Sequence, residues 1–221
     1  MPEILYAFDI GTTGVKAGAL TPGGELIGTT YREYGVSYPG PQWVEQSIPE
    51  MWEAQCLASR ELIEGFSINP NDIAVVAISS QRATFSPLDK DGRPLTNFIG
   101  WQDKRSIQQC ERMSELIGAE RYYRIAGLPI EPTAAVSKIA WLREHSPEIF
   151  ESAHQFASTQ NVHLAQLGVE NAPCDLPDAA YIGLLDVDNC EWSEELLDLL
   201  EIPPEKMPPL APSCQLVGQV S

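Results

Sequence analysis

The sequence predicts an α/β fold, in which strands and helices alternate along a chain of 221 residues. Three observations predict this class. Short segments rich in strand-forming residues open the chain at 4–8, 15–20 and 26–31, and turn residues separate them. An amphipathic pattern over 51–66 then predicts a helix. A continuous apolar run follows at 73–78, as expected for a strand that is buried on both faces of a sheet.

The turn between the first two segments carries a carboxylate, two glycines, two hydroxyls and a lysine. These residues are Asp9, Gly11, Thr12, Thr13, Gly14 and Lys16. Glycine lets a ligand approach the backbone closely, and threonine can donate hydroxyl and backbone N–H bonds to phosphate oxygens. Lysine can neutralise phosphate charge, and aspartate can hold Mg²⁺ directly or through water. This stretch alone is compatible both with phosphate binding and with an ordinary hairpin tip.

The helix over 51–66 has a clear start signal, because Ser47 is a good N-cap and Pro49 and Glu50 suit a first turn. Ser193 is a second predicted N-cap, before a helix that opens with two acidic residues. An Asp-Gly turn at 91–92 predicts a hairpin between these helices.

Polar residues follow the apolar run at 73–78, where Gln81 and Arg82 come directly after the predicted strand. The carboxyl ends of strands are where α/β sheets bind ligands. A guanidinium there can donate several hydrogen bonds to the vicinal hydroxyls of a sugar or polyol. In so acidic a chain, the alternative is a surface arginine paired with an acidic neighbour.

Trp101 and Asp103 form a further candidate pair. Aromatic faces pack against the C–H surfaces of sugars, and carboxylates accept hydrogen bonds from hydroxyls. Trp101 could equally be a core aromatic residue. Asp103 could equally cap the following helix, whose apolar stripe is predicted from Ile107, Cys110, Leu116 and Ile117.

The composition excludes several classes of protein. The formal net charge is -17, which argues against nucleic-acid binding and against an anionic membrane surface as the main role. No segment has the length of a transmembrane run, and no signal-peptide pattern opens the chain. Five scattered cysteines without a C-x-x-C pair indicate reduced thiols, so we expect a cytoplasmic protein.

A family resemblance begins at the first turn. The stretch from Asp9 to Thr13, followed by Lys16, resembles the first phosphate motif of the FGGY carbohydrate kinases, which belong to the actin, Hsp70 and hexokinase superfamily. Further segments resemble family motifs in the same order, at 43–46, 79–85, 97–105, 127–142, 175–180 and 216–221. The resemblance implies a ribonuclease H-like (actin-like ATPase) domain. Its mixed sheet would open with antiparallel strands, with helices on both faces and a family strand at 216–221.

The resemblance also implies ATP and Mg²⁺ as cofactors and a sugar or polyol as substrate. It assigns Asp9 to the metal, and Gly11, Thr12, Thr13 and Lys16 to the phosphates. It assigns Gln81, Arg82, Trp101, Asp103 and Thr133 to the acceptor. Asp178 lies in a segment that borders the pocket, and we expect it to brace a loop. Two positions depart from glycerol kinase: Ala83 replaces a glutamate, and Thr133 replaces a tyrosine. A longer polyol or a ketose is therefore expected to suit the pocket better than glycerol.

The resemblance implies that residues 1–221 are the N-terminal, substrate-side domain of such a kinase. The family's general base, in a "G-D-Q/N" motif, and its adenosine site would lie beyond the chain end. The expected partner is a C-terminal kinase domain, in the same polypeptide or as a separate subunit, and a homodimer is left open. By itself the chain is expected to show no kinase activity. The alternative to an enzyme is a non-catalytic sugar-binding or regulatory module.

Overall fold

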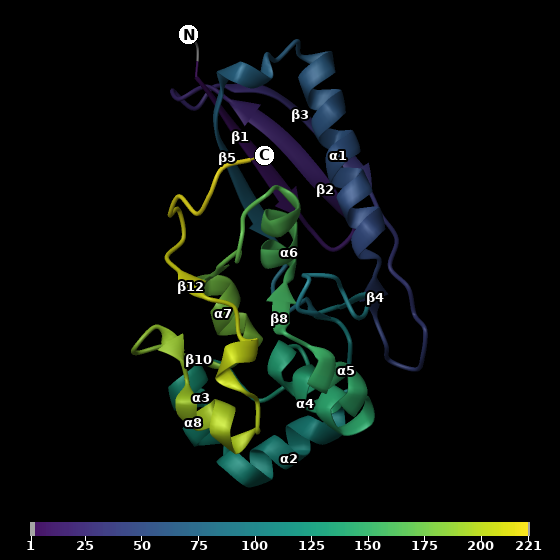
Figure 1. Cartoon of the computed structure of the whole chain (residues 1–221), viewed down its shortest axis with the longest axis vertical. Coiled ribbons are helices and arrows are strands. Elements are labelled where there is room, and N and C mark those ends of the chain that lie inside the picture. Colours follow the sequence, from purple (N-terminus) through teal and green to yellow (C-terminus); the bar gives the residue numbers. More distant parts are fainter. Residues whose placement is uncertain (1–2, 221) are drawn as a thin grey trace. The chain divides into compact units, whose positions relative to one another are not determined.

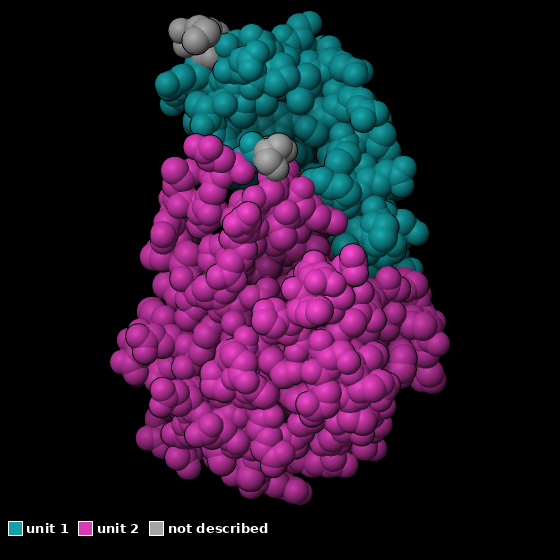
Figure 2. Space-filling model, viewed as in Figure 1, with its two compact units in different colours: residues 1–36, 46–81, 220–221 teal, residues 37–45, 82–219 magenta. Residues whose placement is uncertain are grey.

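The computed structural model describes residues 3–220 (Figure 1). The chain divides into two compact units (Figure 2). Unit 1 comprises residues 1–36, 46–81 and 220–221, and unit 2 comprises residues 37–45 and 82–219. Helices and strands alternate along the chain, which confirms the α/β class. Within residues 3–220, no helix combines the length and the apolar character needed to cross a membrane.

Unit 1 contains a four-stranded sheet with the order β3-β2-β1-β5. Its strands are β1 (Ile4–Ile10), β2 (Gly14–Leu20), β3 (Leu26–Glu33) and β5 (Ile73–Ser80). β2 is antiparallel to both β1 and β3, whereas β5 is parallel to β1. The predicted antiparallel opening of a mixed sheet is therefore confirmed. Residues alternate between buried and more exposed along β1, which gives the sheet one core face.

Helix α1 (Ile48–Gly65) packs on β2 and β3. Its start is as predicted, because the Ser47 side chain accepts a hydrogen bond from the backbone N–H of Glu50 and proline lies in the first turn. Met51, Ala58 and Leu62 lie fully buried along one stripe. The short 3₁₀ helix η1 (Pro70–Asp72) then leads into β5.

Two sequence expectations for strands are wrong. No residue of β5 is fully buried, and Val75 is 42% exposed, because β5 is the edge strand of this sheet within the described residues. Its apolar run therefore does not mark a strand covered on both faces. The expected strand at 216–221 is absent from residues 216–220, which have no regular secondary structure, and Ser221 lies outside the described residues.

Unit 2 contains short strands and most of the helices. A four-stranded sheet has the order β4-β7-β6-β8, and two-stranded sheets pair β10 with β11 and β9 with β12. The strands are β4 (Glu45–Gln46, of which Glu45 belongs to unit 2), β6 (Phe85–Leu88), β7 (Phe98–Ile99), β8 (Gln155–Ser158), β9 (Cys174–Asp175), β10 (Leu185–Asp186), β11 (Glu191–Trp192) and β12 (Leu210–Ala211). The helices are α2 (Ile107–Ile117), α3 (Ala119–Ala126), α4 (Ala135–His145), α5 (Pro147–Ser152), α6 (Thr159–Gln166), α7 (Leu176–Ile182), α8 (Glu194–Leu199) and the 3₁₀ helix η2 (Pro204–Lys206).

Helix α4 is the centre of unit 2. Residues 135–140 and 142 are all buried, so the first part of this helix is covered on every side, whereas Glu144 and His145 at its end are exposed. It packs against α2, α5 and α7. The expected cap of α8 is confirmed, since the Ser193 hydroxyl accepts from the backbone N–H of Leu196. The apolar stripe predicted for α2 is only half right, because Leu116 is 56% exposed and Met113 is buried instead.

Candidate functional site

The polar turn predicted from the sequence joins β1 to β2 in unit 1. The backbone N–H of Gly11 donates to the carbonyl of Gly14 over 2.9 Å and closes the turn. At Gly14 a Cβ atom would lie 2.4 Å from the Tyr31 hydroxyl and 2.5 Å from the Arg32 carbonyl. Only glycine fits there, and the reason is close packing against β3 rather than the approach of a ligand.

The four carbonyl groups of the turn all accept hydrogen bonds from within unit 1. Gly11 accepts from the Tyr34 hydroxyl, and Thr12 accepts from Gln46 Nε2 over 2.7 Å. Thr13 accepts from the Tyr34 backbone N–H over 3.3 Å, and Gly14 accepts from Gly11. Because its carbonyl oxygens are held by protein donors, the turn can receive an anion without presenting unpaired carbonyl dipoles to it.

Asp9 and Lys16 are register partners in the β1–β2 pair, directly beside this turn. Both are exposed, so their side chains share the uncovered side of the hairpin. An accessible carboxylate beside this turn could hold Mg²⁺, which is commonly bound by one or two carboxylates together with substrate phosphates. Among residues 3–220 no group of three or more histidine, cysteine or acidic side chains could form an all-protein metal cage. Thr12 is partly exposed and Thr13 is exposed at the tip.

Gln81 contacts the turn at residues 11–14 indirectly. Its side-chain Nε2 donates to Gln46 Oε1 over 2.7 Å, and its backbone N–H donates to Ile10. Gln46 is 2% exposed and in turn holds the carbonyl of Thr12. Sequence reasoning missed Gln46 and Tyr34 as parts of the site. The position of Gln46 in the family-like stretch 43–46 was the available signal.

Arg82 is exposed in unit 2, where its guanidinium stacks over the Tyr181 ring at 4.4 Å from the ring centre. It is free of the acidic surface partner that the alternative interpretation required, since no ion pair of Arg82 occurs among the described residues. Tyr181 lies on α7 and is 43% exposed. The pair presents a cation and an aromatic ring to solvent, which suits hydroxyl groups and sugar C–H faces.

Asp178 lies one turn before Tyr181 on α7 and is 3% exposed. Both of its carboxylate oxygens lie buried without a hydrogen-bond partner within the described residues. Burial raises the pKa of this carboxyl to about 6, and the nearby Ser158 hydroxyl and the charge of Arg82 oppose the rise. Asp175, and not Asp178, makes the side-chain hydrogen bond that caps α7, so the expectation that Asp178 braces a loop stays a prediction.

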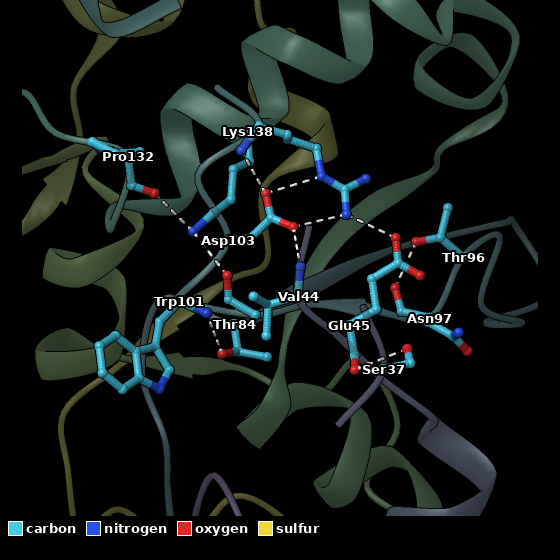
Figure 3. Close-up of polar contacts among 12 residues, drawn as sticks. Ser37, Val44, Glu45, Thr84, Thr96, Asn97, Trp101, Asp103, Pro132 and Lys138 are labelled. Carbon is cyan, nitrogen blue, oxygen red and sulfur yellow. Dashed lines mark hydrogen bonds and ion pairs between the residues drawn. The ribbon is translucent and has the colours of Figure 1, made fainter. Parts of the chain in front are cut away.

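Asp103 is fully buried and already has several donors (Figure 3). It accepts from the Val44 backbone N–H over 2.6 Å, and from the Arg105 backbone and guanidinium over 2.8–3.0 Å. Arg105 also bonds Glu45 over 2.7 Å and lies 3.9 Å above the Trp43 ring. These contacts favour a positioning role for Asp103. The expected helix cap is wrong, because Ser106 occupies the N-cap of α2.

Trp101 is 38% exposed, and its backbone N–H donates to the Thr84 hydroxyl over 3.1 Å. Its ring is therefore accessible to a ligand, as a sugar-packing residue requires. Thr133 is partly exposed, and its carbonyl accepts from Lys138 Nζ over 3.0 Å. Sequence reasoning assigned Lys138 no role.

Comparison with known proteins gives consistent matches over the whole chain. The profile of the FGGY family of carbohydrate kinases, N-terminal domain, matches residues 4–221. A glycerol kinase of Methylibium petroleiphilum is 34% identical over 220 residues, covering 97% of this chain and 44% of the relative. A glycerol kinase of Thermococcus kodakarensis is 30% identical over 222 residues, covering 99% of this chain and 44% of the relative.

Solved structures agree in fold. A gluconate kinase from Lactobacillus acidophilus superposes with a TM-score of 0.93 at 24% identity, covering 100% of this chain and 44% of that one. A glycerol kinase from Plasmodium falciparum, solved with ADP, superposes with a TM-score of 0.89 at 19% identity, covering 100% of this chain and 45% of that one. These likenesses show the fold. The chain spans less than half the length of the curated relatives that it matches.

Proposed function

Because the chain belongs to the FGGY family of carbohydrate kinases and matches its N-terminal domain, we propose that it forms the acceptor-side part of an ATP-dependent kinase. That kinase would transfer the γ-phosphate to a hydroxyl of a sugar or polyol. The observation that carries the proposal is the turn at residues 11–14, whose four carbonyls are all held by protein donors beside Asp9 and Lys16. The family assignment favours this reading over a non-catalytic sugar-binding module.

In this proposal the turn binds phosphate through Gly11, Thr12 and Thr13, and Lys16 neutralises phosphate charge. Asp9 holds Mg²⁺ through its exposed carboxylate. Bound MgATP supplies the phosphoryl group. Phosphoryl transfer depends mainly on positioning and charge stabilisation, so a turn with fixed carbonyls suits the task.

The acceptor would contact Arg82, Trp101 and Thr133, all of which have exposed or partly exposed side chains. Gln81 and Asp103 belong to the same assignment as positioning groups, since both are engaged in hydrogen bonds with neighbours. Ala83 and Thr133 are small, so we expect a longer polyol or a ketose to fit better than glycerol. The named relatives and fold neighbours include kinases of glycerol, gluconate and xylulose, which sets the range of acceptors to test.

The general base and the adenosine site are proposed to lie in the part of the kinase that corresponds to the unmatched length of the relatives. That part would be continuous with residues 1–221 or a separate subunit. We also propose a cytoplasmic location, because the five free cysteines suit a reducing compartment. The homodimer remains a proposal that sedimentation velocity would test.

The test measures ADP formation with a panel of acceptors that includes glycerol, xylulose, ribulose, gluconate and sugar alcohols. The complete kinase is expected to turn over at least one of them, and Asp9→Ala is expected to abolish that turnover. The isolated chain is expected to show none. The proposal fails if no acceptor stimulates ADP formation by the complete protein. The assignment of the pocket fails if glycerol is the best acceptor.

A further inference from the structure

Lys138 is an unusual residue for the core of unit 2. It lies in the stretch 135–140 of α4, in which every residue is buried, and its own side chain is fully buried. A buried ammonium is costly unless hydrogen-bonded partners replace the lost water. Burial lowers the pKa of this amine to about 7, and the Asp103 carboxylate opposes that change. A lysine at such a position therefore needs compensation from its surroundings.

The compensation comes from four backbone carbonyls on three separate segments. Figure 3 shows the contact of Lys138 with the carbonyl of Pro132. Nζ donates to Ala83 over 3.4 Å and to Gly100 over 3.2 Å. It also donates to Pro132 over 3.1 Å and to Thr133 over 3.0 Å. Segments that are 17 and 32 residues apart in the sequence thus meet at one atom. A neutral amine would keep two N–H donors, so these contacts weaken but persist on deprotonation.

Each of the three segments carries a candidate acceptor contact. Ala83 directly follows Arg82, Gly100 directly precedes Trp101, and Thr133 is itself a candidate. The first segment also has to be held against its own backbone preference, because Ala83 has a positive φ of 57° and is 2% exposed. A non-glycine residue in the left-handed region persists only where its surroundings fix it.

We propose that Lys138 is a positioning residue of the acceptor pocket, which ties together the three backbone segments that carry Arg82, Trp101 and Thr133. Its ammonium sets the spacing of these side chains without touching the acceptor, since the lysine is fully buried. This inference rests on the proposed function, which makes those three residues acceptor contacts. Misplacement of positioning groups by about 1 Å can cost a large factor in rate.

The chain offers a matched control in Lys206 of η2. Its Nζ donates to the carbonyls of Phe150, Glu151 and Ala153 over 2.6–3.1 Å. Lys206 thus makes the same kind of carbonyl tether in the same unit, but the segment that it holds carries no candidate acceptor residue. Substitution of either lysine should therefore lower the stability of the protein, whereas only substitution of Lys138 should also weaken acceptor binding.

The first measurement compares Lys138→Met, Lys138→Arg and Lys206→Met in the complete kinase, with the best acceptor of the panel. Lys138→Met should raise the acceptor KM at least about tenfold and leave the ATP KM within about twofold. Lys138→Arg keeps the cation but carries it on a larger, planar group, so it should recover only part of the loss. Lys206→Met should leave both KM values unchanged. The inference is overturned if Lys138→Met leaves the acceptor KM unchanged, or if Lys206→Met raises it as much.

The second measurement, hydrogen exchange, needs no turnover. Peptides covering 82–86, 98–104 and 130–135 should exchange faster in Lys138→Met than in Lys206→Met. Unchanged exchange there overturns the inference even if the kinase is active. If the wild-type kinase shows no turnover but these peptides exchange faster in Lys138→Met, the proposed function is wrong, and so is the acceptor role of Lys138. In that case the result still supports Lys138 as the residue that holds the three backbone segments together. If Lys138→Met does not fold, Lys138→Gln is measured in both experiments, and unchanged KM and exchange overturn the inference.

Discussion

The guanidinium of Arg82 lies 4.4 Å above the centre of the Tyr181 ring. The cation is therefore held by an aromatic face, and within residues 3–220 no ion pair occupies its N–H donors. In an ion pair, a carboxylate would have occupied some of these N–H donors. The stacking explains how a long, flexible side chain can present several donors to vicinal hydroxyls in one fixed orientation.

Removal of Arg82 should therefore weaken acceptor binding. Arg82→Ala is expected to cost on the order of 1.5–3 kcal/mol, or a rise of about 10- to 150-fold in the acceptor KM. Tyr181→Leu removes only the stacking and should cost about 0.5–1 kcal/mol. Tyr181→Phe keeps the ring and serves as the control, with an expected acceptor KM close to that of the wild type. An Arg82→Ala kinase with unaltered acceptor KM would remove Arg82 from the pocket.

The hydroxyl of Tyr34 should matter for ATP rather than for the acceptor. Tyr34→Phe leaves the carbonyl of Gly11 without its donor, which is expected to destabilise the fold by about 1–3 kcal/mol and to raise the ATP KM. Tyr6→Phe is the control, because the Tyr6 hydroxyl bonds Ser59 in the same unit, away from the turn. If both variants change the ATP KM equally, the effect reflects general stability and not the turn.

Gly14→Ala tests the packing of the turn against β3. The new Cβ would meet the Tyr31 ring and the Arg32 carbonyl at 2.4–2.5 Å, and a backbone carbonyl cannot move aside cheaply. We expect a loss of about 1–3 kcal/mol or more in the free energy of unfolding, measured by urea denaturation. Gly65→Ala at the end of α1 meets nothing within 4 Å and should be neutral or slightly stabilising. Equal stability of the two variants would contradict this account of Gly14.

Asp178 should make the stability of the protein depend on pH. Its pKa is raised from 3.8 to about 6, so the folded state binds this proton more tightly than the unfolded state. Protonation of Asp178 therefore raises the free energy of unfolding as the pH falls from 6 to 3.8. Above pH 6 the ionised carboxylate lowers the free energy of unfolding by about 3 kcal/mol. His163 has the opposite effect, because burial lowers its pKa from 6.5 to about 4. Because the unfolded state binds this proton more tightly, His163 lowers the free energy of unfolding as the pH falls from 6.5 to about 4.

Asp178→Asn should expose the effect of His163. The variant is expected to be more stable than the wild type at pH 7.5, by about 1–3 kcal/mol. It should lose this advantage between pH 6 and pH 4, while the wild type, with both groups, changes less. Urea denaturation at several pH values measures the stability of each protein, and the variant by itself shows the effect of His163. In the difference between the two proteins, the common effects of His163 and of the other acidic groups cancel. A difference that does not vary with pH would show that the carboxyl titrates normally.

The sequence by itself determined those features that depend on local order. Gly14 and its polar neighbours predicted the β1–β2 turn, and Ser47 with Pro49 predicted the start of α1. The resemblance of several segments, in order, to motifs of the FGGY carbohydrate kinases indicated the family that the later comparisons found. Local signals succeed here because caps, turns and alternating burial are set by residues within a few positions of one another.

The tertiary structure alone decided the roles of residues whose partners are distant in the chain. Asp103 was predicted as an acceptor contact, but Val44 and Arg105 occupy its carboxylate. Lys138 was assigned no role, but four carbonyls surround its Nζ. Val44 is 59 residues from Asp103, and Ala83 is 55 residues from Lys138. No periodicity encodes such meetings, because a buried polar group is stabilised by whichever distant donors or acceptors the fold brings to it.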